Sequence, residues 1–296
     1  MSSDCVKLRF SQLYAVKRHK DDTLRSMDVR TLLDQRVPIN RIPDQLLSAG
    51  IHMFTIQDAV RVADVSETSA RPALARLEEN NKVFSPSRGL YVAIPPEYRA
   101  WGTTPATWFI DALMAYLSRA YYVAFLSAAE LHEAAHQRPQ VFQVAVDRDL
   151  RNRSFGRVRL RFITNRAAGE LPIVRINVPT GTIAVATPEL TALDLTNRPS
   201  QGGGLGNVAT IIIELADDKK LRIDRIAALV ERFPLAAARR LGWLLENLAE
   251  LDAGPLAEII RKSSREPSQL DPHGPRRGHV DARWHVRVNT QVEADL

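Results

Sequence analysis

The sequence has a single cysteine, Cys5, and no apolar run close to the roughly 20 residues that a membrane-spanning helix requires. One cysteine excludes a disulfide within the chain, and a reducing cytoplasm is then the simplest location. The stretch from Met1 to Arg9 lacks the apolar core of a signal peptide, so we expect no secretion. We therefore predict a cytoplasmic protein without a membrane partner.

Acidic residues are fewer than basic ones, with 34 Asp and Glu against 40 Lys and Arg, which makes the formal net charge +6. This excess fits an anionic partner, although a mild excess is common and decides little alone. Hydrophobic residues form 45% of the chain, enough for a sizeable core. A length of 296 residues suits two domains.

Residues 54–92 carry the most informative pattern. Thr55 can cap a short helix over 56–63, and Asp64 and Val65 then turn the chain. A second helix follows from the hydroxyl-rich start at 66–69 and ends near Asn80, and residues 82–92 predict a two-stranded hairpin. Helix, tight turn, helix and hairpin is the order of a winged helix-turn-helix, whose second helix enters the major groove of DNA. A purely structural helical hairpin is the alternative.

The second helix of this pattern has one apolar and one polar face. Ala70, Leu74 and Leu77 predict its buried stripe. Pro72 conflicts with a helix interior, because proline lacks an N–H and clashes with the preceding turn. We therefore expect the helix to start near Thr68, which keeps Pro72 in the first turn.

The predicted DNA contacts lie on the outward face of this helix and on the hairpin. Arg71 is expected to pair with a guanine edge, while Thr68 and Ser69 contact bases or phosphate. Lys82 and Arg88 are expected to contact the DNA backbone. The full set of predicted DNA-binding residues is Glu67, Thr68, Ser69, Arg71, Arg76, Lys82, Ser87 and Arg88.

The fold class predicted for the whole chain is α+β. The winged helix is expected at about 39–92, with its first helix at 43–50, inside an N-terminal DNA-binding domain of residues 1–97. An additional helix is expected at 24–33, and the basic cluster 17–20 is either a solvated surface or a contact to the DNA backbone. Pro95 and Pro96 mark the boundary to a mixed C-terminal domain, residues 98–296.

The C-terminal domain is predicted to combine a sheet with a block of helices. Its expected strands are 141–146, 157–163, 173–178 and 182–186, and a final strand at 283–288 is expected to join the same sheet after a linker at 264–279. Its expected helices are 104–117, 123–136, one that begins after Thr187, 208–215, 223–233, 235–251 and 255–262.

Six arginines follow one another without an intervening acid in residues 151–166. Such a row on an edge strand is either solvated, where it discourages aggregation, or a basic surface for nucleic acid or an acidic protein. Its members are Arg151, Arg153, Arg157, Arg159, Arg161 and Arg166.

Two short motifs, one with two histidines and one rich in glycine, could each be a ligand site or could have only a structural role. His132-Glu133-x-x-His136 matches H-E-x-x-H, in which two histidines bind zinc and the glutamate is the general base. Pro139 follows closely and no third ligand stands at a recognisable spacing, so we expect no metal and no catalysis. The glycine-rich loop 201–207 could hold a phosphate, but it lacks the lysine of a P-loop and is expected to be a connector capped by Asn207.

Most of residues 50–290 resembles the AbiEi-type antitoxins, the winged-helix regulators of type IV toxin–antitoxin systems. The matching blocks are RGLY at 88–91, YYVAFLSAAELH at 121–132, AHQ at 135–137, TPELTALDL at 187–195 and LGWLL at 241–245. The family usually has glycine where this chain has Glu133, so the zinc motif looks like a local accident.

The resemblance implies a repressor that binds inverted repeats at its own promoter. It also implies a cotranscribed nucleotidyltransferase toxin, which the antitoxin counteracts without a stable complex, and it places the antitoxin activity in the C-terminal domain. No cofactor is implied. The alternative is an enzyme in which a winged helix tethers a zinc hydrolase built on His132, Glu133 and His136.

Overall fold

The computed structural model describes residues 36–135, 139–217, 220–264 and 266–293, and it has an α+β fold. The chain divides into two compact units. The N-terminal unit contains the described chain up to Ala120 together with Asn152–Arg159 and Asn177–Ile183. The C-terminal unit contains Tyr121–Arg151, Leu160–Ile176 and the described chain from Ala184 onward. Residues 98–120, expected to belong with the C-terminal domain, thus lie in the N-terminal unit.

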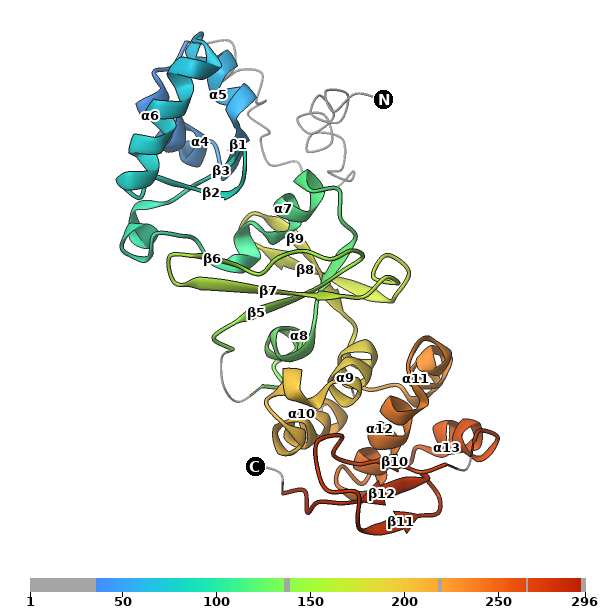
Figure 1. Ribbon diagram of the computed structural model, residues 1–296. Coiled ribbons are helices and arrows are strands. Elements are labelled where there is room, and N and C mark those ends of the chain that lie inside the picture. The colour runs from blue at the N-terminus through green and yellow to red at the C-terminus, as the bar shows by residue number, and fades with distance from the viewer. Residues whose placement is uncertain (1–35, 136–138, 218–219, 265, 294–296) are drawn as a thin grey trace. The chain divides into compact units, whose positions relative to one another are not determined.

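Three α-helices of the N-terminal unit gather on one small sheet (Figure 1). These helices, preceded by a 3-10 turn at Ile39–Arg41, are α4 (Ile42–Ser48), α5 (Ile56–Ala63) and α6 (Glu67–Glu79). Their apolar faces form one core, which includes Ile56, Ala59 and the predicted stripe Ala70, Leu74 and Leu77. The three predicted helices are confirmed, with their ends shifted by a residue or two.

Side-chain caps fix the angle between α5 and α6. Thr55 accepts from the backbone N–H of Asp58, whose carboxylate in turn accepts from Thr55, so α5 begins with a complete capping box. Asp64 ends α5 in the left-handed region at φ 52°, and Ser66 caps α6 by accepting from the N–H of Ser69 at 3.2 Å. Each such cap contributes about 0.5–2 kcal/mol to helix stability.

Helix α6 starts one residue before the expected Thr68, but Pro72 lies past its first turn, so the expectation that the first turn holds Pro72 is wrong. The reason is the cap, because the Ser66 hydroxyl begins the helix at Glu67. The missing N–H of Pro72 costs the helix one bond to the carbonyl of Thr68. Pro72 itself is exposed, so its ring needs no space in the core.

The sheet of the N-terminal unit has the strand order β1-β3-β2. The strands are β1 (Met53–Thr55), β2 (Val83–Ser87) and β3 (Leu90–Ala93), all paired antiparallel. The β2–β3 hairpin confirms the predicted one, and Gly89 provides its turn at φ +81°. The sequence pattern does not predict strand β1, because three residues are too few for a recognisable alternation.

The hairpin is supported by residues distant in sequence but in the same unit. Phe84 of β2 packs edge-on against Phe109 at 5.1 Å between ring centroids and lies 5.5 Å from Phe155. Arg153 donates a hydrogen bond to the carbonyl of Pro86. The helix expected over 104–117 is shorter than predicted, since a 3-10 turn at Ala106–Trp108 precedes α7 (Ile110–Tyr116).

The largest sheet has six strands in the order β6-β7-β5-β4-β9-β8. The strands are β4 (Tyr121–Val123), β5 (Phe142–Val146), β6 (Arg153–Phe155), β7 (Val158–Thr164), β8 (Ile173–Val178) and β9 (Gly181–Ala186). All four predicted strands are present. The arginine-bearing strand β7 is not an edge strand, however, because β6 pairs beside it. The helix expected at 123–136 is shorter than predicted, because β4 ends at Val123 and the helix covers only Phe125–Leu131.

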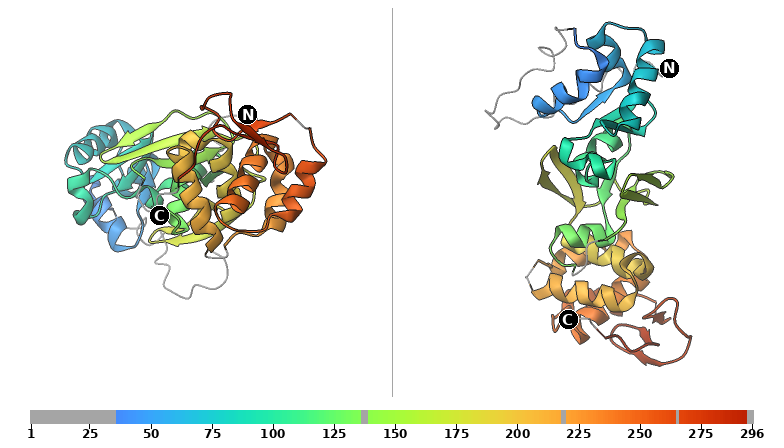
Figure 2. Two further views of the ribbon diagram at one scale, coloured as in Figure 1. Left: turned by 90° about the horizontal axis from the view of Figure 1, so that it is seen from below. Right: turned by 90° about the vertical axis from the view of Figure 1, so that its left-hand side faces the viewer.

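The helices of the C-terminal unit lie close together in both views of Figure 2, and most of them contact α9. They are α8 (Phe125–Leu131), α9 (Pro188–Asn197), α10 (Leu205–Asp217), α11 (Ile223–Leu229), α12 (Leu235–Asn247) and α13 (Gly254–Arg261). Thr187 caps α9 with Pro188 at its start, as predicted. Helix α10 begins before Asn207, so the predicted cap there is wrong; Asn207 donates to the carbonyl of Gly202 instead.

The last strands form a separate sheet, so the expected return of residues 283–288 to the main sheet is wrong. The order is β10-β12-β11, with β10 at Ser268–Gln269, β11 at His279–Asp281 and β12 at Val286–Val288. Trp284 attaches this sheet to α12, with a side chain only 1% exposed. Its ring lies directly over Gly242, where no Cβ would fit.

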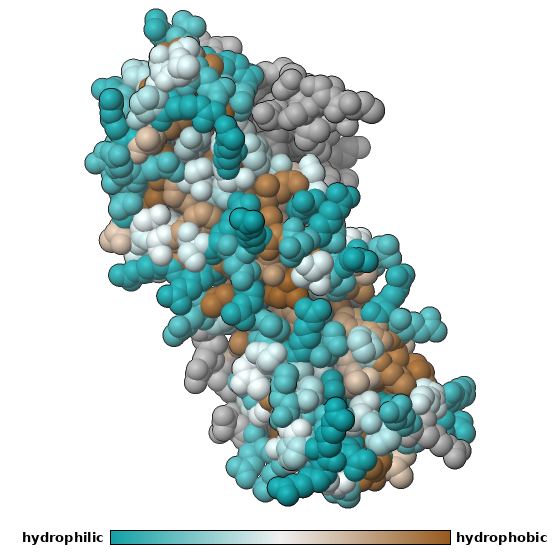
Figure 3. Space-filling view, viewed as in Figure 1, coloured by the Kyte–Doolittle hydropathy of each residue, from teal (hydrophilic) through white to brown (hydrophobic). Residues whose placement is uncertain are grey.

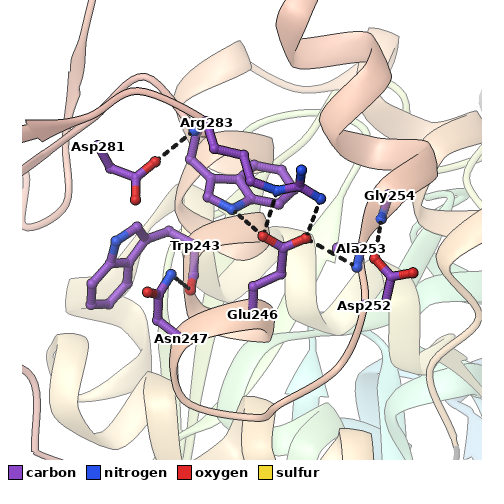
Figure 4. A network of polar contacts seen from close by, with 9 residues as sticks. Trp243, Glu246, Asn247, Asp252, Ala253, Gly254, Asp281 and Arg283 are labelled. Carbon is purple, nitrogen blue, oxygen red and sulfur yellow. Dashed lines mark hydrogen bonds and ion pairs between the residues drawn. The ribbon is translucent and has the colours of Figure 1, made fainter.

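Glu246 of α12 completes this attachment (Figure 4). Its carboxylate accepts two hydrogen bonds of 2.7 Å from Arg283 and one of 2.9 Å from the indole N–H of Trp284. Burial by itself would raise the pKa of Glu246, but these donors hold that pKa below its usual value. The carboxylate is therefore charged at neutral pH.

None of the helices in the described ranges has the length and apolar composition needed to cross a bilayer. The expected helix at 24–33 and the basic cluster at 17–20 lie outside the described residues, as does His136.

We expect Gly242→Ala to destabilise the protein by about 1–3 kcal/mol, the usual cost of overpacking. In a helix interior alanine is ordinarily better than glycine by about 1 kcal/mol, so a loss would identify the clash with Trp284, whose ring lies 2.0 Å from where the added Cβ would stand. Urea unfolding provides the measurement. Gly254→Ala is the control, because its nearest neighbour is a flexible carboxylate at 3.4 Å; equal stability of both variants would contradict the packing argument.

Candidate nucleic-acid interface

Helix α6 presents a polar face to solvent. Glu67, Thr68, Arg71 and Arg76 are all exposed, whereas the opposite stripe of the helix is buried. Arg71 forms an ion pair with Glu67 one turn earlier, with side chains 47% and 45% exposed. At that exposure the pair is weak, so Arg71 can exchange Glu67 for another acceptor at little cost. The part of the molecule that holds α4 to α6 is mostly hydrophilic on the side shown in Figure 3.

Three hydroxyl groups meet at the start of α6. The Ser66 hydroxyl lies 2.7 Å from that of Thr68 and 2.9 Å from that of Ser69. Ser66 is committed to the cap, but Thr68 and Ser69 are exposed. The helix N-terminus also carries partial positive charge, which favours an anion such as a DNA phosphate near these hydroxyls.

The hairpin tip is held in a fixed conformation. The hydroxyl of Tyr116 donates a 2.9 Å hydrogen bond to the carbonyl of Arg88, and burial raises the pKa of Tyr116, which keeps this donor protonated. Ser87 accepts from the Ser85 hydroxyl through its own carbonyl at 2.9 Å. The side chain of Arg88 remains exposed. The tip therefore presents a cation from a backbone that is already ordered.

A second group of cations lies where α4, α6 and β2 meet. Lys82 and Arg99 both contact the carboxylate of Asp44, at 3.3 and 3.1 Å. They line an open pocket of about 430 Å³ together with Arg76 and Asn80. No local pattern singles out Arg99 or Asp44, because each is distant from α6 along the chain.

The eight predicted DNA-binding residues are thus distributed over three places in one unit. Glu67, Thr68, Ser69 and Arg71 lie at the start of α6, and Ser87 and Arg88 lie at the hairpin tip. Arg76 and Lys82 lie at the pocket. Five cations against two partly paired acids, counting Arg99 and Asp44, make these surfaces electropositive, and such surfaces attract nucleic acid.

The six arginines of residues 151–166 are divided between the two units and make different contacts. In the N-terminal unit Arg153 supports the hairpin, Arg157 stacks over Trp101 at 5.8 Å, and Arg159 is exposed. In the C-terminal unit Arg161 donates to Gln201 at 3.3 Å. Arg151 and Arg166 are exposed there. Individual contacts therefore explain several of these side chains.

The H-E-x-x-H sequence does not have the geometry of a zinc helix. Helix α8 ends at Leu131, so His132 is only its C-cap, and Glu133 has a left-handed φ of 60°. The Nε2 atom of His132 lies 2.7 Å from the carbonyl oxygen of Ala186, and burial lowers the pKa of this imidazole. Within the described ranges, no three side chains of His, Cys, Asp or Glu gather as a metal site requires.

The glycine-rich loop is shaped by packing. A Cβ on Gly202 would come within 2.4 Å of Val208 and 2.9 Å of Leu195. Gly203 and Gly204 have φ of +82° and +107°, which favour glycine. Packing and backbone conformation account for these glycines without a phosphate.

Comparison with known proteins gives two findings. Residues 122–247 match the family model described as the AbiEi antitoxin C-terminal domain. The fold is similar to the crystal structure of the RV2827C protein from Mycobacterium tuberculosis, with a TM-score of 0.62 and 17% identity over 86% of this chain and 92% of that one. No curated protein matches the sequence.

We expect chelation to leave the protein folded, because His132 already bonds to Ala186 and α8 ends before Glu133. Thermal unfolding before and after EDTA treatment should give the same Tm, and elemental analysis should find less than one zinc per chain. Stoichiometric zinc that disappears in both His132→Ala and His136→Ala would overturn this and favour the hydrolase alternative.

Proposed function

We propose that this chain, in which residues 122–247 match the AbiEi antitoxin C-terminal domain, is a DNA-binding antitoxin that represses its own operon. The family match supports the antitoxin role. The DNA-binding role rests on residues 39–92, which lie outside the matched range 122–247.

We propose that residues 39–92 form a winged helix-turn-helix with α6 as the recognition helix. The order of α5, the turn at Asp64, α6 and the β2–β3 hairpin supports this assignment. The observation that carries the proposal is the exposed face of α6, where Glu67, Thr68 and Arg71 project away from the core. A helix of this length spans about 20 Å, and the major groove, about 12 Å wide, accepts such a helix.

Arg71 is the candidate for reading sequence. Its guanidinium group can bind O6 and N7 of guanine with two hydrogen bonds, once it leaves Glu67. Glu67 is then available to accept from a cytosine amino group. Thr68 and Ser69 would contact bases or phosphate beside the helix N-terminus.

Arg88, Lys82 and Arg76 are proposed to contact the DNA backbone, with Arg99 as an addition from the structure. Such contacts fix the orientation of the protein without reading sequence. The hydrogen bond from Tyr116 to the Arg88 carbonyl supports this role, because an ordered hairpin loses less conformational entropy on binding.

The remaining parts of the proposal follow from the family resemblance. The operator would consist of inverted repeats at the protein's own promoter. The functional partner would be a cotranscribed nucleotidyltransferase toxin, counteracted in the cytoplasm without catalysis, cofactor or stable complex. We propose that the antitoxin activity resides in the C-terminal domain predicted from the sequence, residues 98–296.

Arg71→Ala should weaken binding to the promoter duplex by about 1–3 kcal/mol and binding to a scrambled duplex by much less, as expected for a base contact. Fluorescence anisotropy titrations on both duplexes measure the two affinities. Arg88→Ala should instead weaken both similarly and reduce the slope of log K against log salt by about 1.

Arg261→Ala is the matched control, because Arg261 is also an exposed helical arginine, paired with Glu258 at 2.8 Å, but lies in α13. It should bind both duplexes like the native protein. If Arg71→Ala loses equal affinity for both duplexes, Arg71 does not read bases.

Antitoxin activity should be separable from DNA binding. A full-length variant with both Arg71→Ala and Arg88→Ala, produced from an unrelated promoter, should still restore growth of cells that express the neighbouring toxin. Growth curves, with immunoblots of both proteins, provide the measurement. Failure of a well-expressed double variant would indicate that antitoxicity is repression alone.

A further inference from the structure

The C-terminal unit contains a small pocket of about 200 Å³ built on three neighbouring strands. Tyr122 of β4 pairs with Ala145 of β5, which in turn pairs with Ile163 of β7. This register places the three side chains in one row across the sheet, and all three line the pocket. The walls come from the end of β7, the end of α9 and residues 232–234.

Asp194 is a buried carboxylate that has a hydrogen bond with Tyr122 but keeps one oxygen without a donor. It lies in α9, lines the pocket and is only 4% exposed. Among the described residues, no group donates a hydrogen bond to its Oδ2 atom. Burial raises the pKa of Asp194 to about 7, although Tyr122 and Arg198 oppose that rise. A buried acceptor without a partner is costly, so this atom marks a place where a donor from a ligand would be stabilising.

Three guanidinium groups line the same pocket, from Arg166, Arg198 and Arg232. Arg232 also contacts Glu170 at 2.9 Å, but both side chains are more than half exposed, so that pair is weak. Planar guanidinium groups match phosphate oxygens with paired hydrogen bonds. The amide groups of Asn165 and Asn197 add further polar contacts.

The pocket also has an apolar part, formed by Phe125, Phe233, Pro234 and Ile163. A ligand that satisfies all three features needs a flat apolar ring, an N–H donor on that ring and an anionic group. A nucleotide has these properties, whereas a free phosphate lacks the ring and the N–H donor.

We propose that this pocket binds a nucleoside phosphate, with a guanine N–H edge at Asp194 and the phosphate at Arg166 and Arg198. Guanine fits best because it carries two adjacent N–H donors on one edge. The pocket residues lie within one unit and within the family match, so this proposal does not rest on DNA binding.

Isothermal titration of the full-length protein with GMP, AMP, CMP, UMP, guanosine and inorganic phosphate tests the proposal. GMP should bind with one site per chain, and guanosine and phosphate should each bind at least about tenfold more weakly. Asp194→Asn and Arg166→Gln should each weaken GMP binding about tenfold or more. Arg261→Ala should bind GMP like the native protein.

Arg166→Gln keeps the test decisive if Asp194→Asn fails to fold, because Arg166 is exposed. Native GMP affinity in a folded Arg166→Gln variant would overturn the proposal, as would phosphate binding as tight as that of GMP. Tighter binding of a nucleotide with another base would overturn the guanine assignment. If none of the four nucleotides binds, the proposal that this pocket is a nucleotide site is wrong. The same samples titrated with promoter DNA report separately on the DNA-binding function.

Discussion

The burial of α9 is the constraint on which the C-terminal unit depends. Every residue from Glu189 to Thr196 is buried, so the polar side chains of this helix need partners inside the protein. Glu189 accepts from the backbone of Arg222, and Thr196 donates back to the carbonyl of Ala192. Arg240 of α12 donates to the carbonyl of Thr196 at 3.1 Å. Two buried atoms of this helix have no hydrogen-bond partner in the described chain, Oγ1 of Thr191 and Oδ2 of Asp194. Of these two residues Asp194 lines the pocket, and an incomplete network beside a pocket is where a ligand site is expected.

The N-terminal unit is organised by a different device, the two capped starts of α5 and α6. The caps at Thr55 and Ser66, with the left-handed turn at Asp64, orient α6 so that its apolar stripe is buried and its polar face is free. The same geometry leaves Pro72 inside α6, past its first turn. The hairpin next to this helix is supported by Tyr116, Arg153 and Phe155, and these come from segments that sequence reasoning assigned to the other domain.

The two proposals assign different ligands to the two units, a polymer to the N-terminal unit and a small molecule to the C-terminal unit. Exposed, weakly paired cations such as Arg71 suit a large polyanion. In the free protein water solvates these cations, and on binding the phosphates or bases of the polyanion would take the place of that water. The pocket around Asp194 is instead small and mixed in polarity, which suits a ligand of limited size. If both proposals hold, one antitoxin chain would combine promoter recognition with nucleotide sensing in separate units.

The sequence by itself determined the features that depend on neighbours in the chain. These include the caps at Thr55, Ser66 and Thr187, the buried stripe of α6, the β2–β3 hairpin and the alternating strand β7. Tertiary structure decided what depends on distant partners. Gly242 is required by Trp284, β7 is internal because β6 pairs beside it, and the pocket exists because register places Tyr122, Ala145 and Ile163 in one row. Local patterns report hydrogen bonds within a turn or two, whereas strand order, packing and the pairing of buried charges arise only when the chain folds back on itself.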